Sequence, residues 1–335
     1  MLAMKRCLAA IAFAVVTFVA IPASAQQFTM KMSFPTVNDV HHEFFKRLKA
    51  GIDQRSGGRI KTEIYPANQL GQIPTVVEGV ALGTIEVGTA ASGFFVSLEP
   101  RFQVLDAPGI FDGILHANKV VDDPAIRTRL ATWGADKGIE MLTVGVYSPF
   151  VIVSHRAIRS VADFQGQKVR TTGGAPIQVE PFRKLGILPM SLPLGEALPA
   201  MQNRTIDGMI SGPTVFTNFK YYDVVKAMTF LPRTTLVAPA IVNRRWLKSL
   251  GPELEAIVRE EARKAEVAYS DWNVEDNKRG EEIWKRNGGE LITLQQAEAQ
   301  RYLDLVSPSA LQVLSANPKV KEDYDALLAA AQKYR

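Results

Sequence analysis

One stretch near the carboxyl end restricts the fold of this chain more than any other feature, because it predicts an unusually long helix. Residues 252–287 carry apolar side chains at three- and four-residue steps, from Leu254 to Trp272, and this spacing places them on one face of an α-helix. Pro252 suits a first helical turn and Gly288 suits an end. At about 1.5 Å per residue the helix would be roughly 54 Å long, longer than a small domain. It must therefore lie across more than one domain, or the stretch breaks into two shorter helices at a bend.

Strand-like and helix-like segments alternate along the rest of the chain. Ile60, Thr62 and Ile64 alternate as in a strand, whereas Phe44 and Leu48 have helical spacing. The alternation predicts an α/β protein with a mainly parallel sheet and helices on both faces. The length is that of one large or two medium domains. The predicted strands are 28–34, 59–65, 85–90, 141–146, 151–155, 168–172 and 206–210, and the predicted helices are 39–54, 73–82, 115–137, 177–185 and 197–203.

The amino-terminal segment is typical of a signal peptide. Two basic residues precede an apolar run over residues 7–21, and small residues at 23–25 suit a cleavage site. The run is shorter than the about 20 residues that a membrane span needs, and no second such run follows in the sequence. We expect a cleaved signal peptide over residues 1–25, a mature chain that begins near Gln26, and export to the periplasm. The alternative is an uncleaved anchor.

The sequence carries little that points to catalysis. Its single cysteine, Cys7, lies inside the predicted signal peptide, which leaves the mature chain without a thiol for a disulfide, a nucleophile or a cysteine-type zinc site. No nucleophile elbow, phosphate loop or dinucleotide fingerprint appears. The adjacent His41 and His42 would point in different directions, whereas metal ligands on a helix are about three or four residues apart, so we predict a surface feature at a helix start. We expect no enzyme activity, no cofactor and no metal.

The distribution of charge argues against one class of partner. The formal net charge is +5, from 39 basic and 34 acidic residues, and the two kinds are interspersed along the chain. Nucleic-acid binding favours a clustered basic patch. We therefore expect no nucleic-acid partner.

Arg170 is the residue with the clearest chemical meaning. It lies at the carboxyl end of a predicted strand, and Thr171, Thr172, Gly173 and Gly174 follow it. In open α/β sheets, ligands bind beyond the carboxyl ends of strands. A guanidinium there can donate two parallel hydrogen bonds to a carboxylate, and glycines let the backbone approach a ligand closely. The residues alone leave two interpretations open, a carboxylate-binding arginine or a surface arginine in a salt bridge.

Six motifs occur in order along the chain. They are YPANQLG at 65–71, GVALGTIEV at 79–87, APGIFD at 107–112, DFQGQKVR at 163–170, LGI at 185–187 and GEALPAMQNRTIDG at 195–208. Together, in this order and with these gaps, they resemble the solute-binding subunits of tripartite ATP-independent periplasmic (TRAP) transporters of the dicarboxylate type. The resemblance covers nearly the whole mature chain.

The resemblance implies a two-domain α/β clamshell with a hinge, and with the long helix running behind both domains. We place residues 26–147 and about 236–273 in the first domain, and residues 148–235 and about 274–335 in the second. A member of this family captures a small organic acid by domain closure and delivers it to the membrane subunits of a TRAP permease. Arg170 matches the family's arginine for the ligand carboxylate. We expect a monomer.

The chain departs from the family pattern at several positions. Many members carry a second ligand-facing arginine, for which the spacing from Ile158 gives about Phe150 here. Sialic-acid binders use charged residues after the third strand, where this chain has the uncharged residues 90–94. Asparagine is frequent in the family at the position of Ser211, and an aromatic residue near Leu194. The predicted ligand-binding residues are Arg170, Phe94, Phe150, Ser92, Leu194, Ser211 and Thr172.

These departures predict a pocket with one cation in an otherwise apolar setting. A dianion buried beside one arginine would leave a charge poorly compensated. We therefore expect a monocarboxylate with a hydrophobic or aromatic body, whose burial supplies most of the affinity. The alternative is that Phe94 and Phe150 are ordinary core residues.

Two other functions stay open at this point. The first is a periplasmic binding protein that serves a sensor kinase or a chemoreceptor in place of a permease. The second is a secreted α/β enzyme, which would turn its ligand over instead of binding it stoichiometrically.

Overall fold

The structure is a computed structural model, and it describes residues 27–335. The predicted signal peptide, its cleavage site and Cys7 lie outside the described residues. Within the described range, none of the helices combines the length and the apolar character that crossing a membrane would need.

Within residues 27–335, nine strands form one mixed sheet with its two longest strands at the centre. The order is β2-β1-β3-β8-β4-β7-β5-β6, with β9 paired to β8. The pairs toward either edge are parallel, whereas β8 and β4 run antiparallel to each other and to β3 and β7. The expected parallel sheet is therefore interrupted in its middle. The strands are β1 (Phe28–Ser33), β2 (Ile60–Tyr65), β3 (Val87–Thr89), β4 (Ile139–Ser154), β5 (Lys168–Thr171), β6 (Leu188–Ser191), β7 (Gly208–Ser211), β8 (Ala227–Asn243) and β9 (Glu290–Thr293).

The helices begin and end largely where the residue types predict. Asp39 caps α1, because its side chain accepts the N–H of His42, and α2 has the predicted bounds. The predicted segment 115–137 is broken, because Asp123 caps a new helix and Pro124 takes its first position. The α-helices are α1 (Val40–Ser56), α2 (Ile73–Leu82), α3 (Ile114–Val121), α4 (Pro124–Leu130), α5 (Pro176–Lys184), α6 (Leu194–Gln202), α7 (Pro213–Asn218), α8 (Arg244–Ser249), α9 (Gly251–Arg286), α10 (Gln296–Ser315) and α11 (Pro318–Lys333), and two 3-10 helices, η1 (Ser92–Phe95) and η2 (Pro100–Asp106), follow β3.

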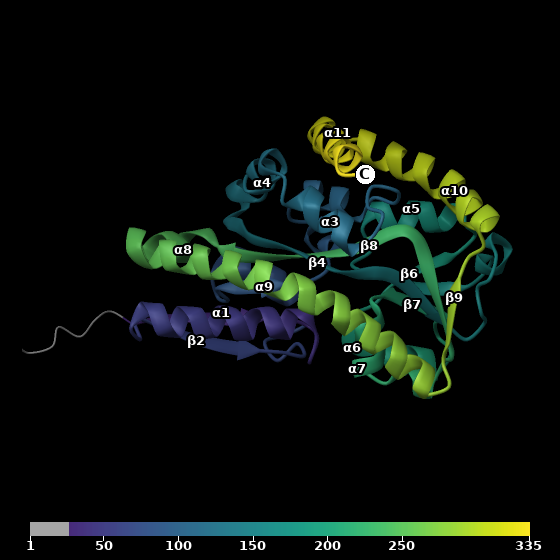
Figure 1. The fold of residues 1–335 in the computed structure, drawn as a ribbon, viewed down its shortest axis with the longest axis horizontal. Helices are drawn as coiled ribbons and strands as arrows, with labels where there is room; N and C mark the ends of the chain where they lie inside the picture. Colours follow the sequence, from purple (N-terminus) through teal and green to yellow (C-terminus); the bar gives the residue numbers. More distant parts are fainter. Residues whose placement is uncertain (1–26) are drawn as a thin grey trace, which may run out of the picture.

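The molecule has two halves on either side of the central strands. We call β1–β3 with α1–α4, η1 and η2 the first half, and β5–β7 with α5–α7 the second half; β4 and β8 run through both. Helix α10 packs on α5 in the second half, whereas α11 packs on η2, α3 and α4 in the first half. Figure 1 shows this return of the carboxyl-terminal helix to the first half, above α3 and α4.

Strand β4 corrects one prediction. The sequence predicts two strands, 141–146 and 151–155, whereas the structure has one strand of 16 residues. Ser148 and Pro149 suggest a turn, but β-bulges on either side of them absorb the irregularity without ending the pairing with β8. At the same level, the register on β8 skips residues 231–234. Both central strands are therefore irregular where they pass from one half to the other.

Helix α9 is a single helix of 36 residues that contacts elements of both halves. Figure 1 shows its course without a break from α8 toward α7. The prediction of one long helix is confirmed, and the alternative of two shorter helices is wrong. Asn273 and Asn277 lie on its buried face and donate hydrogen bonds to the carbonyls of Val146 (2.9 Å) and Tyr147 (3.1 Å). The helix thus binds β4 at one of its bulges.

Candidate functional site

A pocket with an empty volume of about 370 Å³ lies where the two halves face each other. Residues that follow β1, β3 and β5, and the last residue of β7, contribute to its wall. It therefore sits at the carboxyl ends of strands, where open α/β sheets bind ligands. The lining residues are Pro35, Thr36, His41, Ile73, Ala91 and Phe94 from the first half, Tyr147 and Leu236 from the central strands, and Arg170, Thr172, Leu194, Ser211 and Val215 from the second half.

Arg170 is a buried cation that lacks a counter-charge. Its residue is 1% exposed, and Nε donates to the carbonyl of Leu192 at 3.0 Å. Among residues 27–335, its Nη2 atom has no hydrogen-bond partner. Burial lowers the pKa of Arg170 to about 10, opposed by Tyr221 and by no carboxylate of the described chain. The side chain stays protonated at neutral pH, and an unpaired buried charge is costly, so this end of the pocket favours an anion.

Phe94 covers the guanidinium. The carbon at the centre of the Arg170 guanidinium lies 5.7 Å from the centroid of the Phe94 ring, a cation–π distance. Phe94 also lines a wider groove, with an empty volume of about 1350 Å³, that runs past α2 and the exposed Leu82. Phe94 is therefore the side chain that lies between the buried pocket and the open groove.

Thr172 is held by a polar network that joins the two halves. Its N–H donates to Oε1 of Gln178 at 2.9 Å, and Nε2 of Gln178 donates to the Thr172 hydroxyl oxygen and to Oδ2 of Asp106, the latter at 2.9 Å. Because the Thr172 oxygen accepts from Gln178, its hydroxyl hydrogen remains available to donate to another group. Asp106 also accepts from the hydroxyl of Ser92. Burial raises the pKa of Asp106 to about 7, against the opposing effect of these donors.

The backbones of the two halves touch beside this network. A Cβ on Gly93 would lie 2.5 Å from the carbonyl oxygen of Thr172, and a Cβ on Gly173 would lie 2.7 Å from the carbonyl oxygen of Gly93. Gly173 also has a φ of +84°, which L side chains rarely adopt. Glycine is therefore required at both positions for this contact to form.

His41 and Tyr147 form the opposite wall of the pocket. His41 is 8% exposed, its Nδ1 lies 3.1 Å from the Thr36 hydroxyl, and its ring centroid lies 4.7 Å from that of Tyr147. The Tyr147 hydroxyl donates to Oδ2 of Asp39 at 2.6 Å, and Asp39 is itself buried. Burial lowers the pKa of His41, and Asp39 opposes this effect, so the imidazole is neutral at pH 7. Its Nε2 atom has no partner within the described part of the chain.

The structure brings together five of the seven predicted residues. Arg170, Phe94, Thr172, Leu194 and Ser211 line the pocket. Ser92 and Phe150 do not line it. Ser92 is buried and donates to Asp106 instead. Phe150 is buried away from the pocket, because a position counted back from Ile158 takes no account of the bulges on β4.

His41 corrects a further prediction. The sequence predicts a surface feature for the two adjacent histidines, but only His42 is partly exposed, and His41 is buried in the pocket wall. The spacing of the apolar residues could have predicted that His41 is buried, since it precedes Phe44, Phe45 and Leu48 on the buried face of α1. Tyr147 was not among the predicted site residues, because it lies between the two predicted strands 141–146 and 151–155.

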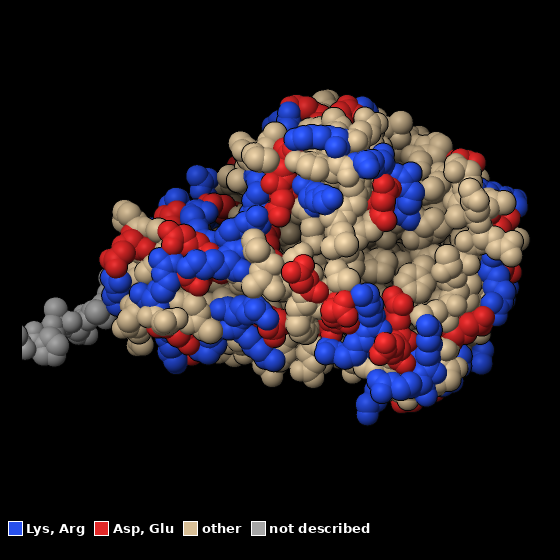
Figure 2. All heavy atoms as spheres, viewed as in Figure 1, with Lys and Arg blue, Asp and Glu red and all other residues tan. Residues whose placement is uncertain are grey.

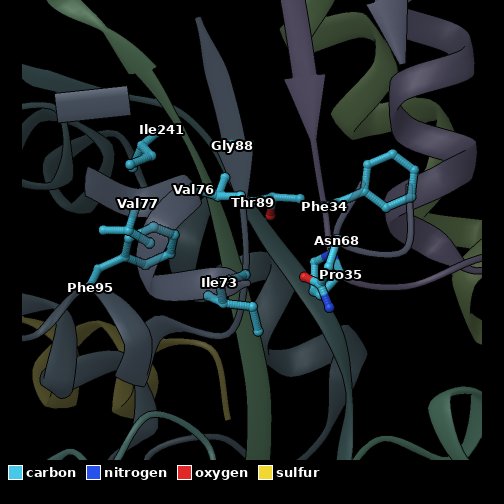
Figure 3. Close-up of a pocket in the computed structure, with 11 residues that line it drawn as sticks. Phe34, Pro35, Asn68, Ile73, Val76, Val77, Gly88, Thr89, Phe95 and Ile241 are labelled. Atoms are coloured by element: carbon cyan, nitrogen blue, oxygen red, sulfur yellow. The ribbon is translucent and has the colours of Figure 1, made fainter. Parts of the chain in front are cut away.

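A second, mainly apolar pocket, whose empty volume of about 230 Å³ includes space open to solvent, adjoins the first pocket and shares Pro35 and Ile73 with it. Figure 3 shows Val76, Val77 and Phe95 at its wall, beside the strand that carries Gly88. The first-half side of the pocket therefore continues into apolar surroundings.

The outer surface has a mixed charge. Figure 2 shows basic and acidic side chains intermingled over the face that it presents. This agrees with their interspersed order in the sequence.

Three comparisons place this architecture among known proteins. The model of the bacterial extracellular solute-binding protein family 7 matches residues 32–315. The 2,3-diketo-L-gulonate-binding periplasmic protein YiaO of Escherichia coli (strain K12) is 25% identical over 76% of this chain and 77% of its own length. The TRAP periplasmic solute-binding protein from Desulfovibrio salexigens with bound orotic acid has a TM-score of 0.87 and 20% identity, over 92% of this chain and 100% of that one. The TRAP periplasmic solute-binding protein from Shewanella oneidensis with bound succinate has a TM-score of 0.84 and 20% identity, over 91% and 99%. The two structures share the fold of this chain.

Proposed function

We propose a function from one premise: this chain belongs to the bacterial extracellular solute-binding proteins of family 7, the binding subunits of TRAP transporters. The predicted resemblance is thus confirmed at the level of the family. The family and the fold are those of transport binding proteins and not of enzymes. The proposal is that this protein captures a small organic acid in the periplasm and delivers it to the membrane subunits of a permease.

The observation that carries the proposal is the uncompensated charge of Arg170. The guanidinium is buried and one of its nitrogens, Nη2, has no partner among residues 27–335. A carboxylate placed at Nη2 would supply both the missing hydrogen bond and the missing negative charge. Thr172 and Ser211 line the same pocket and add hydroxyl groups near this end. The relatives named for 2,3-diketo-L-gulonate, orotic acid and succinate also bind carboxylates.

The rest of the pocket suits an apolar ligand body. Ile73, Phe94, Leu194, Val215 and Leu236 line it, and Arg170 is its one cation within the described chain. Apolar burial contributes about 25 cal/mol per Å² of surface removed from water. The proposed ligand is therefore a monocarboxylate with a hydrophobic or aromatic body.

We propose that capture works by closure of two lobes about the bulged part of β4 and β8. The first lobe comprises residues 27–147 and about 236–273, and the second comprises residues 148–235 and about 274–317. We add residues 318–335 to the first lobe, in place of the predicted second, because α11 packs on η2, α3 and α4. Hinge motions of this kind concentrate backbone change in a few residues, and the irregular pairing at Ser148 and Pro149 offers such a place.

The test is the substitution Arg170→Met, with ligand binding measured by titration calorimetry and thermal shift over a panel of organic acids. We expect the affinity for the bound acid to fall at least about 100-fold, as for a lost buried charge pair. We also expect the unliganded variant to be as stable as the wild type or more stable, because a costly buried charge is removed. The matched control is Arg183→Ala, which removes an exposed arginine of the same lobe. Binding that survives in Arg170→Met would show that another group receives the carboxylate, and the proposal would be abandoned.

A further inference from the structure

Two residues that line the pocket, one from each half, carry a buried polar atom that lacks a partner in the described chain. One is Nη2 of Arg170 and the other is Nε2 of His41, and neither has a hydrogen-bond partner in residues 27–335. Their residues are 1% and 8% exposed. Buried polar groups in folded proteins are nearly always hydrogen-bonded. One ligand that spans the pocket would satisfy both atoms, so it should carry a polar group at each end.

The two walls differ in charge. Arg170 supplies a cation to one wall. The other wall has a neutral imidazole, and behind it lies Asp39, whose carboxylate accepts the hydroxyl of Tyr147 and the N–H of His42. Asp39 is buried, and it forms no ion pair with a basic side chain of the described chain. A second ligand carboxylate beside His41 would therefore face a negative charge without a cation to balance it.

From this asymmetry, and resting on the proposed function, we infer that the His41 wall selects the ligand class. The site takes monocarboxylates that carry an uncharged hydrogen-bonding group, such as a hydroxyl, carbonyl or amide, at the end remote from the carboxylate. It rejects dicarboxylates of the same shape. A neutral imidazole has one ring nitrogen that donates and one that accepts, so a hydroxyl or amide can pair with Nε2 in either tautomer.

The sharpest test compares acids that differ in charge and hardly in shape. The probes are succinate with succinamate, glutarate with glutaramate, and terephthalate with 4-carbamoylbenzoate, each titrated calorimetrically at neutral pH. We expect at least one monoamide to bind, and to bind about 30-fold or more tightly than its dicarboxylate, because like charges at close range oppose binding. A dicarboxylate that binds as tightly as its monoamide overturns the inference.

Two variants test whether the His41 wall causes the preference for the monoamide. In Asp39→Asn, the helix cap is retained while the charge is removed, and we expect the preference for the monoamide to shrink about tenfold. In His41→Leu, we expect the monoamide to lose its advantage over the matching methyl analogue, such as 4-methylbenzoate. The control Asp53→Asn neutralises a partly exposed carboxylate on the same helix and should leave both preferences unchanged. An unchanged preference in Asp39→Asn contradicts the inference.

The outcomes separate this inference from the proposed function. Arg170-dependent binding of acids without a remote polar group, with no monoamide binding, overturns the inferred ligand class and leaves the binding function standing. If the wild-type protein binds no carboxylate of the panel in preference to other compounds, both the inferred ligand class and the proposed function are overturned.

Discussion

The two halves of this protein meet at several places, and two of these junctions are built differently. At the crossover, β4 and β8 run through both halves, and Asn273 and Asn277 of α9 bind the carbonyls at the bulge of β4. At the other junction, the backbones of Gly93 and Gly173 touch and Gln178 donates to Asp106. The first junction is part of the continuous chain, whereas lobe opening would break every contact of the second. The pocket lies between the halves, so a bound ligand and the second junction should stabilise each other.

The largest expected effect comes from preventing the second junction from forming. In Gly173→Val, the new side chain would collide with the backbone of Gly93. We expect ligand affinity to fall by about 100-fold or more, because the closed state would become a minor population. Titration calorimetry with an acid that binds the wild type measures this loss.

A matched control separates the collision from backbone strain. Gly166 lies in the same half and has a φ of +75°, and a Cβ there would meet no atom within 4 Å. Gly166→Val should therefore lower the free energy of unfolding, because a valine at a positive φ is strained, but it should leave the ligand affinity unchanged. Equal affinities for the two variants would mean that ligand binding does not require the contact.

A smaller effect is expected from the titration of Asp106. Burial raises its pKa from 3.8 to about 7, so the folded protein holds this proton more tightly than the unfolded chain. The resulting stabilisation is fully present below about pH 4 and is lost progressively as the pH rises toward 7. Between about pH 5 and pH 8, the wild type should lose on the order of 2 kcal/mol of unfolding free energy relative to Asp106→Asn. Urea unfolding of both proteins over this range measures the difference, and a difference that does not vary with pH would contradict the assignment.

The smallest effect on binding is expected at the crossover. Asn277→Ala leaves the carbonyl of Tyr147 without the amide that binds it, and we expect a loss of about 1 to 2 kcal/mol in unfolding free energy. Ligand affinity should change by less than about threefold, because the covalent crossing remains. The exposed neighbour Lys278→Ala serves as the control. A loss of affinity larger than the loss of stability would show that this junction also controls closure.

The sequence predicts the parts of this molecule that depend on local chemistry. The α9 helix follows from its apolar periodicity, and the position of Arg170 follows from a strand that ends in threonines and glycines. What it could not predict depends on partners far away in the chain. The β4 strand continues through Ser148 and Pro149 because β8 pairs with it on both sides.

The candidate site shows the same division. Ser92 was predicted to face the ligand, yet it binds Asp106, and Asp106 in turn accepts from Gln178 of the other half. Such a network depends on how the halves meet, and no local sequence pattern predicts it. His41 is different, because its place on the buried face of α1 was readable from the spacing of its apolar neighbours.

The central strands also bear on how the chain folds. Strand β3 pairs with the carboxyl-terminal end of β8, with Val87 opposite Val242, so the first half of the sheet is complete only when residues far apart in the sequence have met. Contacts so distant in sequence slow folding, because loop closure must precede the gain from pairing. A fragment that ends after β4 would lack β8 and α9, and we expect it to stay unfolded. We therefore expect that the two lobes, which are proposed to move relative to each other, do not fold independently.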